Sequence, residues 1–176
     1  RELGWQPDGL YSGFLVTPWN RYGDDEKLRT LQRTLLERLA EIPGVTHAAI
    51  ATNVPMYNYF GRANVIPEGQ TFTPGQEPLA SAISVSSDFF AALGIPLRSG
   101  SVFPKDLRAD ARPMIVVNQA LAQRFWPGQD AIGKRLRMTD RDELAEIIGV
   151  VGDVRMAANL GAPQSALQIY RPLVQF

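Results

Sequence analysis

The sequence predicts a mixed α/β (α+β) fold, and three observations lead to that class. Apolar residues recur at helical spacing between residues 28 and 42. Several short apolar runs are rich in β-branched residues and bounded by Gly or Pro, which is typical of strands. The hydrophobic share of 45% and the charged share of 20% fall within the range of folded globular proteins. A chain of 176 residues is long enough to bury one sizeable core or two small ones.

The first predicted unit is strand–helix–strand. Residues 10–17 combine aromatic and β-branched side chains and end at a proline, which predicts a strand. Asp24 is the expected amino-terminal cap of a helix whose apolar stripe runs to Ile42. A Pro-Gly pair ends this helix, and residues 45–51 predict a second, buried strand. A right-handed crossover would make the two strands parallel neighbours in one sheet.

The rest of the chain predicts shorter elements. Residues 53–78 are rich in Pro and Gly, which favours a long loop with a short strand at 63–66. Asn118 is a predicted helix cap, and Gly149 and Gly152 are predicted bulge positions. We expect strands at residues 79–85, 113–117, 134–138, 146–154 and 166–170, and helices at residues 89–93 and 119–125.

Composition excludes several functional classes. Lys and Arg total 18, as do Asp and Glu, so a neutral chain lacks the basic field that non-specific binding of nucleic acid requires. The absence of Cys excludes disulfides, zinc–thiolate sites, iron–sulfur clusters and a thiol nucleophile. No run approaches 18 apolar residues, so no bilayer span is expected. The chain starts without Met, which we interpret as a segment of a longer protein; a processed mature protein is the alternative.

Residues 128–134 (GQDAIGK) match the spacing of a phosphate-binding P-loop. That chemistry also needs a hydroxyl after the lysine to hold Mg²⁺, and Arg135 stands there instead. The loop should lead from a strand into a helix, whereas here it leaves a predicted helix and enters a predicted strand. The pattern therefore favours a glycine-dependent turn.

Catalytic and metal sites have few candidate residues. His47 is the only imidazole, so a Ser-His-Asp triad would have to use it, and a zinc site would have one nitrogen ligand. Its place in an apolar run favours a partly buried strand residue. Carboxylates gather at residues 24–26 and at Asp140, Asp142 and Glu143, where helix starts and turns account for them. We expect no catalytic residue and no metal.

The densest basic patch comprises Arg124, Lys134, Arg135, Arg137 and Arg141. Phe125 and Trp126 lie beside it, so a stacking surface for single-stranded nucleic acid is one interpretation. The other is an exposed strand next to a helix whose aromatic residue is buried. The neutral total charge favours the second.

The most distinctive candidate for contact with a partner is a loop, residues 56–60. Met56, Tyr57, Tyr59 and Phe60 lie where no periodic core requires them, and such side chains are enriched at interfaces. They would contact a partner or substrate, or fold back over the local core.

An ordered series of short motifs resembles a known family. It comprises PGV (43–45), VSSDFFAALGIPL (85–97), VVNQALAQRFWPG (116–128), IGKRL (132–136), IIGVVGDVR (147–155) and YRPL (170–173). The series resembles the periplasmic core domain of MacB-type ABC transporter permeases, whose membrane part belongs to the FtsX-like group. Residues 1–40 match only in pattern, and Ser101 departs from an Arg found in many relatives.

The resemblance implies a two-lobed domain at the periplasmic face of the bacterial inner membrane, between two transmembrane helices. We place a porter-like lobe at residues 1–86 plus 156–176 and a smaller inserted α+β lobe at 87–155. ATP would bind a separate nucleotide-binding domain, so the domain itself would be non-enzymatic and without cofactor. It would pass ATP-driven motion to substrate export or partner handling, a mechanism called mechanotransmission. Its partners would be the rest of the permease, a second copy in a dimer and a periplasmic adaptor.

Two other functional classes stay open. A free-standing periplasmic ligand-binding protein would have a site between two lobes and a deep apolar pocket. A hydrolase would use His47 or a pair of carboxylates.

Overall fold

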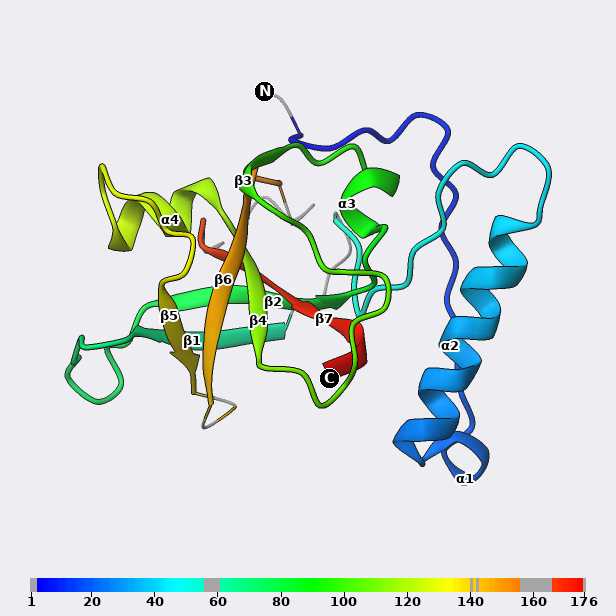
Figure 1. The fold of residues 1–176 in the computed structure, drawn as a ribbon, viewed down its shortest axis with the longest axis horizontal. Helices are drawn as coiled ribbons and strands as arrows, with labels where there is room; N and C mark the ends of the chain where they lie inside the picture. The colour runs from blue at the N-terminus through cyan, green and yellow to red at the C-terminus, as the bar shows by residue number, and fades with distance from the viewer. Residues whose placement is uncertain (1–2, 56–60, 140, 142, 156–165, 176) are drawn as a thin grey trace.

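The computed structural model describes residues 3–55, 61–139, 141, 143–155 and 166–175. Its strands are β1 (Gly61–Pro67), β2 (Leu79–Val85), β3 (Leu97–Gly100), β4 (Met114–Asn118), β5 (Arg135–Met138), β6 (Leu144–Val151) and β7 (Gln168–Pro172). Its helices are α1 (Trp19–Tyr22), α2 (Asp25–Ala40), α3 (Phe89–Ala92) and α4 (Gln119–Phe125), followed by the 3₁₀ turn η1 (Leu173–Gln175). Figure 1 shows the strands gathered together and α2 standing apart at the right of the view.

The seven strands form one sheet in the order β3-β6-β4-β7-β2-β1-β5. A further pairing of β5 with β6 joins the two sides and closes six strands into a barrel. Strand β7, the last in the chain, lies inside the sheet, parallel to β2 and antiparallel to β4. Closure leaves β3 as the edge strand among the described strands.

Two apolar clusters lie on the two sides of these strands. The barrel interior takes alternate residues of its strands and is closed at one end by α4; it comprises Ala63, Val65, Ala80, Ala82, Ile115, Val117, Leu121, Ala131, Leu136, Met138, Ala145, Ile147, Val150 and Ile169. The second cluster lies between the sheet and α3, where the ring of Phe90 contacts those of Phe89 and Tyr170 edge-on, with centroids 5.7 and 4.9 Å apart.

Strand β6 carries an irregularity where it meets two neighbours. Its pairing with β4 shifts register between Ile147 and Gly149, and its pairing with β3 also shifts. A Cβ added to Gly149 would lie 2.1 Å from the carbonyl oxygen of Ser101, so only glycine lets the two backbones approach here. The predicted bulge at Gly149 is therefore confirmed.

A buried asparagine connects three strands. The side-chain oxygen of Asn118 accepts hydrogen bonds from the amides of Leu121, at 3.2 Å, and Gln168, at 3.0 Å. Its amide nitrogen donates to Asp153 Oδ1 and to the carbonyl of Ala166, both at 2.7 Å. Asn118 is fully buried, and these bonds join the end of β4 and the start of α4 to the segments that follow β6 and precede β7.

The network continues along β7. The Gln168 side chain donates to the Val154 carbonyl and accepts from the Val154 amide at 3.2 Å. The Tyr170 hydroxyl donates to Gln168 Oε1 at 3.4 Å. Burial, with a smaller contribution from the Asp153 charge, raises the pKa of Tyr170. The phenol therefore stays protonated and available as a donor at physiological pH.

Most of the predicted elements are confirmed. Asp24 caps α2 by accepting from the amides of Glu26 and Lys27, at 2.9 and 3.0 Å, and Asn118 caps α4. Strand β2 and helix α4 have the predicted bounds, and the strands predicted near residues 63–66, 113–117, 134–138, 146–154 and 166–170 are present with shifted ends. Strand β3 was not predicted, because four exposed residues carry no apolar pattern.

The strand–helix–strand prediction is wrong in its strands. Residues 10–17 form no strand, and of residues 45–51 only Ala51 pairs, by a single antiparallel bridge to Val85. The two segments are therefore not parallel neighbours. An apolar run forms a strand only when another strand offers it hydrogen bonds, and among the described strands only the end of β2 does so, at Ala51.

The sheet contains strands from both of the predicted lobes. Strands β1, β2 and β7 come from the segments assigned to the porter-like lobe, and β3–β6 come from the segment assigned to the inserted lobe. All seven share one sheet, so residues 86 and 155 do not separate two sheets. The division into two lobes stays a prediction. Residues 10–50, which we call the α2 unit, lie outside the sheet (Figure 1).

Replacing Asn118 by Ala tests the buried network. The variant loses a helix cap and leaves the buried Gln168 amide without its acceptor, which costs about 2–4 kcal/mol of unfolding free energy. Urea denaturation of the purified chain measures this cost. Asn118→Asp keeps the acceptor oxygen but turns a second oxygen toward Asp153 and the Ala166 carbonyl, so it should be destabilised as well. Equal stability of Asn118→Ala and the parent chain would contradict the network's role.

Candidate interaction surface

The predicted contact loop, residues 56–60, lies outside the part of the chain that the structure describes. Met56, Tyr57, Tyr59 and Phe60 lie outside the described residues. Their role in contacting a partner or substrate stays a prediction.

His47 is a poor catalytic base in this geometry. Its side chain is half exposed, and Nδ1 lies 3.9 Å from Asp88 Oδ2, which is too long for the hydrogen bond that orients a catalytic imidazole. Lys105 Nζ lies 3.4 Å from the other Asp88 oxygen. The nearby hydroxyl of Ser86 instead accepts from the Ile50 amide at 2.9 Å. These contacts hold the loop that contains His47 against the start of α3.

The P-loop-like segment is a turn, as predicted. It follows α4 and leads into β5, and Gly128 and Gly133 both adopt positive φ angles, 72° and 81°. Asp130 accepts from the amide of Ile132 at 2.9 Å and so stabilises the turn itself. The amides are not arranged at the start of a helix, where a phosphate would bind.

The basic patch is not a stacking platform. Phe125 and Trp126 pack against the barrel core, with their rings 5.8 Å apart. Arg135 forms a two-bond ion pair with Glu68 across the β1–β5 edge. The alternation along β5, with Arg135 and Arg137 outward and Leu136 inward, supports the interpretation as an exposed strand.

A cleft of about 430 Å³ opens beside the carboxyl-terminal turn. Its walls include Met114 and Met138 together with Arg112, Arg141 and Arg171. Charged and apolar groups share the lining, so it lacks the predominantly apolar character of a pocket that encloses a small ligand. Among the described residues, no three carboxylate or imidazole side chains are grouped closely enough to hold a metal ion.

The α2 unit carries most of the exposed apolar surface of the described chain. Six of the nine large exposed apolar side chains belong to it: Tyr11, Phe14, Leu15, Val16, Ile42 and Val45. Four of these form the apolar segment 11–16, in which Tyr11 is 95% exposed and Val16 is 86% exposed. Burying one such side chain contributes about 1.5–3 kcal/mol, so a surface of this kind marks a site of contact.

Helix α2 is only partly covered. Its leucines recur at helical spacing, yet none of its residues is buried. The sequence predicted a strand on each side of this helix, and neither strand forms. Sequence reasoning therefore identified the apolar residues of the α2 unit and missed that the helix leucines are only half-buried and that residues 11–16 are exposed.

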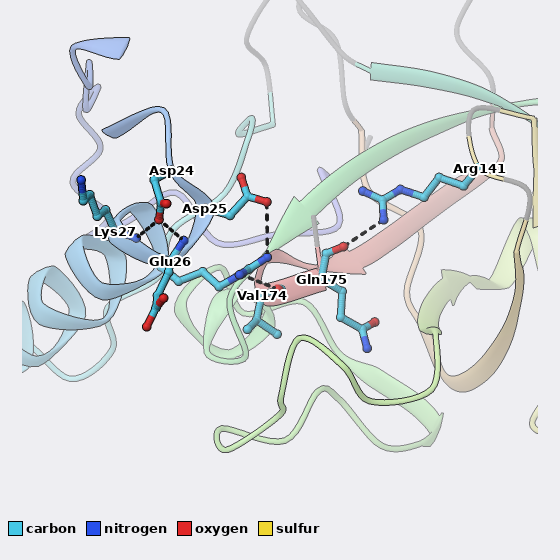
Figure 2. Close-up of polar contacts among 8 residues, drawn as sticks. Asp24, Asp25, Glu26, Lys27, Arg141, Val174 and Gln175 are labelled. Carbon is cyan, nitrogen blue, oxygen red and sulfur yellow. Dashed lines mark hydrogen bonds and ion pairs between the residues drawn. The ribbon is translucent and has the colours of Figure 1, made fainter. Parts of the chain in front are cut away.

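Two arginines hold the carboxyl-terminal turn, and we call these contacts the arginine junction. Arg29 of α2 donates from Nε to the carbonyl of Val174 at 3.1 Å, and Arg141 donates to the carbonyl of Gln175 at 2.9 Å (Figure 2). The side chain of Gln175 donates to the carbonyls of Ala111 and Arg112, at 3.1 and 3.3 Å. The last described turn thus connects α2 with two loops of the barrel.

Arg29 is oriented from its own helix. Asp25, one turn earlier, lies 3.8 Å from its guanidinium, a pairing that the i,i+4 spacing on a helix favours. Hydrogen bonds from Lys27 and Glu26 lower the pKa of Asp24 at the cap, so the cap stays charged at neutral pH. No sequence pattern could identify the junction, because Arg29 and Val174 are 145 residues apart.

A family model described as the MacB-like periplasmic core domain matches residues 8–176 of the chain. No curated protein matches the chain. Among the described residues, no helix combines the length and apolar character that crossing a membrane requires.

Several solved structures share the fold. The periplasmic region of MacB from Actinobacillus actinomycetemcomitans aligns with a TM-score of 0.56 at 14% identity, over 82% of this chain and 56% of that one. A domain assigned to a permease protein of Porphyromonas gingivalis gives 0.50 at 22% identity, over 77% and 54%. The extracellular domain of the noncanonical ABC-type transporter YknZ from Gram-positive bacteria gives 0.51 at 11% identity, over 81% and 62%. The chain thus spans 54–62% of the length of these neighbours.

Arg29→Ala tests the arginine junction. Removing this donor should cost about 1 kcal/mol locally, which corresponds to a roughly fivefold increase in opening of residues 173–175. Hydrogen–deuterium exchange followed by mass spectrometry measures the change. Arg33→Ala, at an exposed arginine one turn further along α2, is the matched control and should leave the exchange unchanged. Equal protection of residues 173–175 in both variants would show that the junction holds nothing in place.

Proposed function

Because the chain belongs to the family of MacB-like periplasmic core domains, we propose that it is the extracytoplasmic domain of an ABC transporter permease. In this role it lies at the periplasmic face of the bacterial inner membrane. The observation that carries the proposal is the family match, which runs through 169 of the 176 residues. The shared fold of three transporter or permease domains supports it.

The proposed mechanism is mechanotransmission without local chemistry. ATP is hydrolysed on a separate nucleotide-binding domain, and the resulting motion of the membrane part reaches this domain and changes its contacts with substrate or partners. The closed barrel supports this role, because a closed sheet with a filled interior transmits displacement with little deformation. The arginine junction gives the α2 unit a defined attachment to that barrel.

The proposed partners follow from this role. They are the rest of the permease, its nucleotide-binding domain, a second copy of the domain and a periplasmic adaptor. No cofactor and no nucleic acid takes part. The alternative of a free-standing ligand-binding protein is less well supported, because the cleft at the barrel has charged walls.

The parent gene offers the first test. It should encode an apolar span of about 20 residues on at least one side of this segment. A parent protein with no such span would overturn the permease assignment.

Electron spin resonance distances test the motion itself. The chain has no Cys, so Glu37→Cys places a single label on the exposed side of α2 in each copy of the domain. In the purified parent permease, the distance between the two labels should shift when ATP binds and return after hydrolysis. A control pair within one copy, Arg62→Cys with Gln123→Cys, reports on the barrel and should stay constant. An unchanged Glu37→Cys distance in every nucleotide state would contradict mechanotransmission.

A further inference from the structure

The cleft of about 430 Å³ lies at the end of the barrel that α4 does not cover. Helix α4 follows the end of β4, whereas the cleft takes Met114 and Ile115 from the start of that strand. Its other barrel walls come from the end of β5, the start of β6 and the end of β7. A ligand in this cleft would therefore reach the mouth of the barrel interior.

Two buried polar side chains point into the barrel near this mouth. Ser84 on β2 and Arg171 on β7 are register partners in parallel strands. Ala82 and Ile169, two positions earlier on the same strands, belong to the barrel core. Strand alternation therefore turns both polar side chains to the barrel side. Ser84 is 1% exposed and Arg171 is 8% exposed.

The hydroxyl of Ser84 has no hydrogen-bond partner among the described residues. A buried polar group without a partner is uncommon in folded proteins, and it calls for a partner from outside the chain. The neighbouring strand position carries Arg171, whose side chain lines the cleft. A ligand that reaches this arginine would therefore come close to the hydroxyl as well.

The cleft carries an excess of positive charge. Its charged lining residues, among those that the structure describes, are Asp110, Arg112, Arg141, Glu143 and Arg171. Asp110 pairs with Arg108, and Arg112 pairs with Glu146. Arg141 and Arg171 then stand against a single carboxylate, that of Glu143, so the described charges leave an excess of one positive charge. Such a cleft suits a monoanion.

The same lining indicates what kind of monoanion fits. A guanidinium presents its N–H donors as a planar fork that matches the oxygens of a carboxylate. It has enough donors to bind a carboxylate and keep an existing contact, such as that of Arg141 with the Gln175 carbonyl (Figure 2). Met114, Ile115 and Met138 add an apolar wall, and methionine adapts to irregular shapes.

We propose that the barrel mouth binds an amphipathic monocarboxylate. Its carboxylate lies at Arg141 and Arg171, with the Ser84 hydroxyl as a further donor. Its apolar body lies against Met114 and Met138. This site lies outside the proposed function, because mechanotransmission needs no ligand at the barrel. The charged walls that disfavour a neutral apolar ligand are the feature that selects this one.

A titration with octanoate tests the site. The purified chain is labelled with ¹⁵N, and a cooperative urea transition establishes that it is folded. Amide shifts in NMR spectra then measure affinity and locate the ligand, which should perturb residues 114–115 and 169–172 most. Octanamide keeps the apolar body without the charge, and acetate keeps the carboxylate without the body. Octanoate should bind at least about tenfold more tightly than either.

Two variants test the named donors. Arg141→Gln should weaken octanoate binding about tenfold, and Ser84→Ala about threefold. Arg124→Gln removes the same charge from the exposed side of α4, at the other end of the barrel, and should leave the affinity unchanged. Ser84→Ala decides the matter if Arg141→Gln lowers the urea midpoint, because it removes only a hydroxyl.

Several results would overturn the proposal. They are no octanoate binding at millimolar concentrations, equal binding of octanamide or acetate, and shifts that centre away from the cleft. An unchanged affinity in Ser84→Ala, or an equal loss in Arg124→Gln, would do the same. All of these readouts concern the chain alone, so a parent protein that proves not to be a permease would remove the proposed function and leave this site standing.

Discussion

The side chain of Asn118 is the constraint on which the barrel depends. It lies where β4 ends and α4 begins, and its four hydrogen bonds use all of its donors and both lone pairs of its oxygen. Two of its partners precede or begin β7, and a third, Asp153, follows β6. A buried amide satisfied in this way admits one register of β4, β6 and β7, because any slip would leave several polar groups without partners in an apolar interior.

Buried side chains are distributed unevenly between the barrel and the α2 unit. The barrel closes on itself through β5 and β6 and fills its interior with alternate strand residues. The α2 unit has a well-capped helix but no buried side chain on it. Local capping and helical spacing determine that α2 forms, whereas only tertiary contacts determine where it packs. Within the arginine junction, the hydrogen bond from Arg29 to the Val174 carbonyl attaches α2 to the turn η1.

Sequence reasoning succeeded where local chemistry decides the structure. Asp24 and Asn118 were identified as caps because short polar side chains bond to amides two or three residues ahead. It failed at residues 10–17 and 45–51. An apolar run indicates that its side chains need to be buried, but it does not identify the segment that will cover them. It also missed the Arg29–Val174 contact, which links positions far apart and carries no local pattern. The family resemblance was confirmed over nearly the whole chain, while the contact loop at residues 56–60 stays a prediction.

The position of β7 determines the order in which the barrel can be assembled during synthesis. Its residues, 168–172, leave the ribosome after β2 and β4, and they pair with β2 on one side and β4 on the other. Until they emerge, both of those strands have an unpaired edge. The two apolar clusters also stay incomplete, because each contains a residue of β7. Folding of this domain is therefore non-local and late, which makes it slow and leaves it dependent on protection from aggregation until the last strand has entered the sheet.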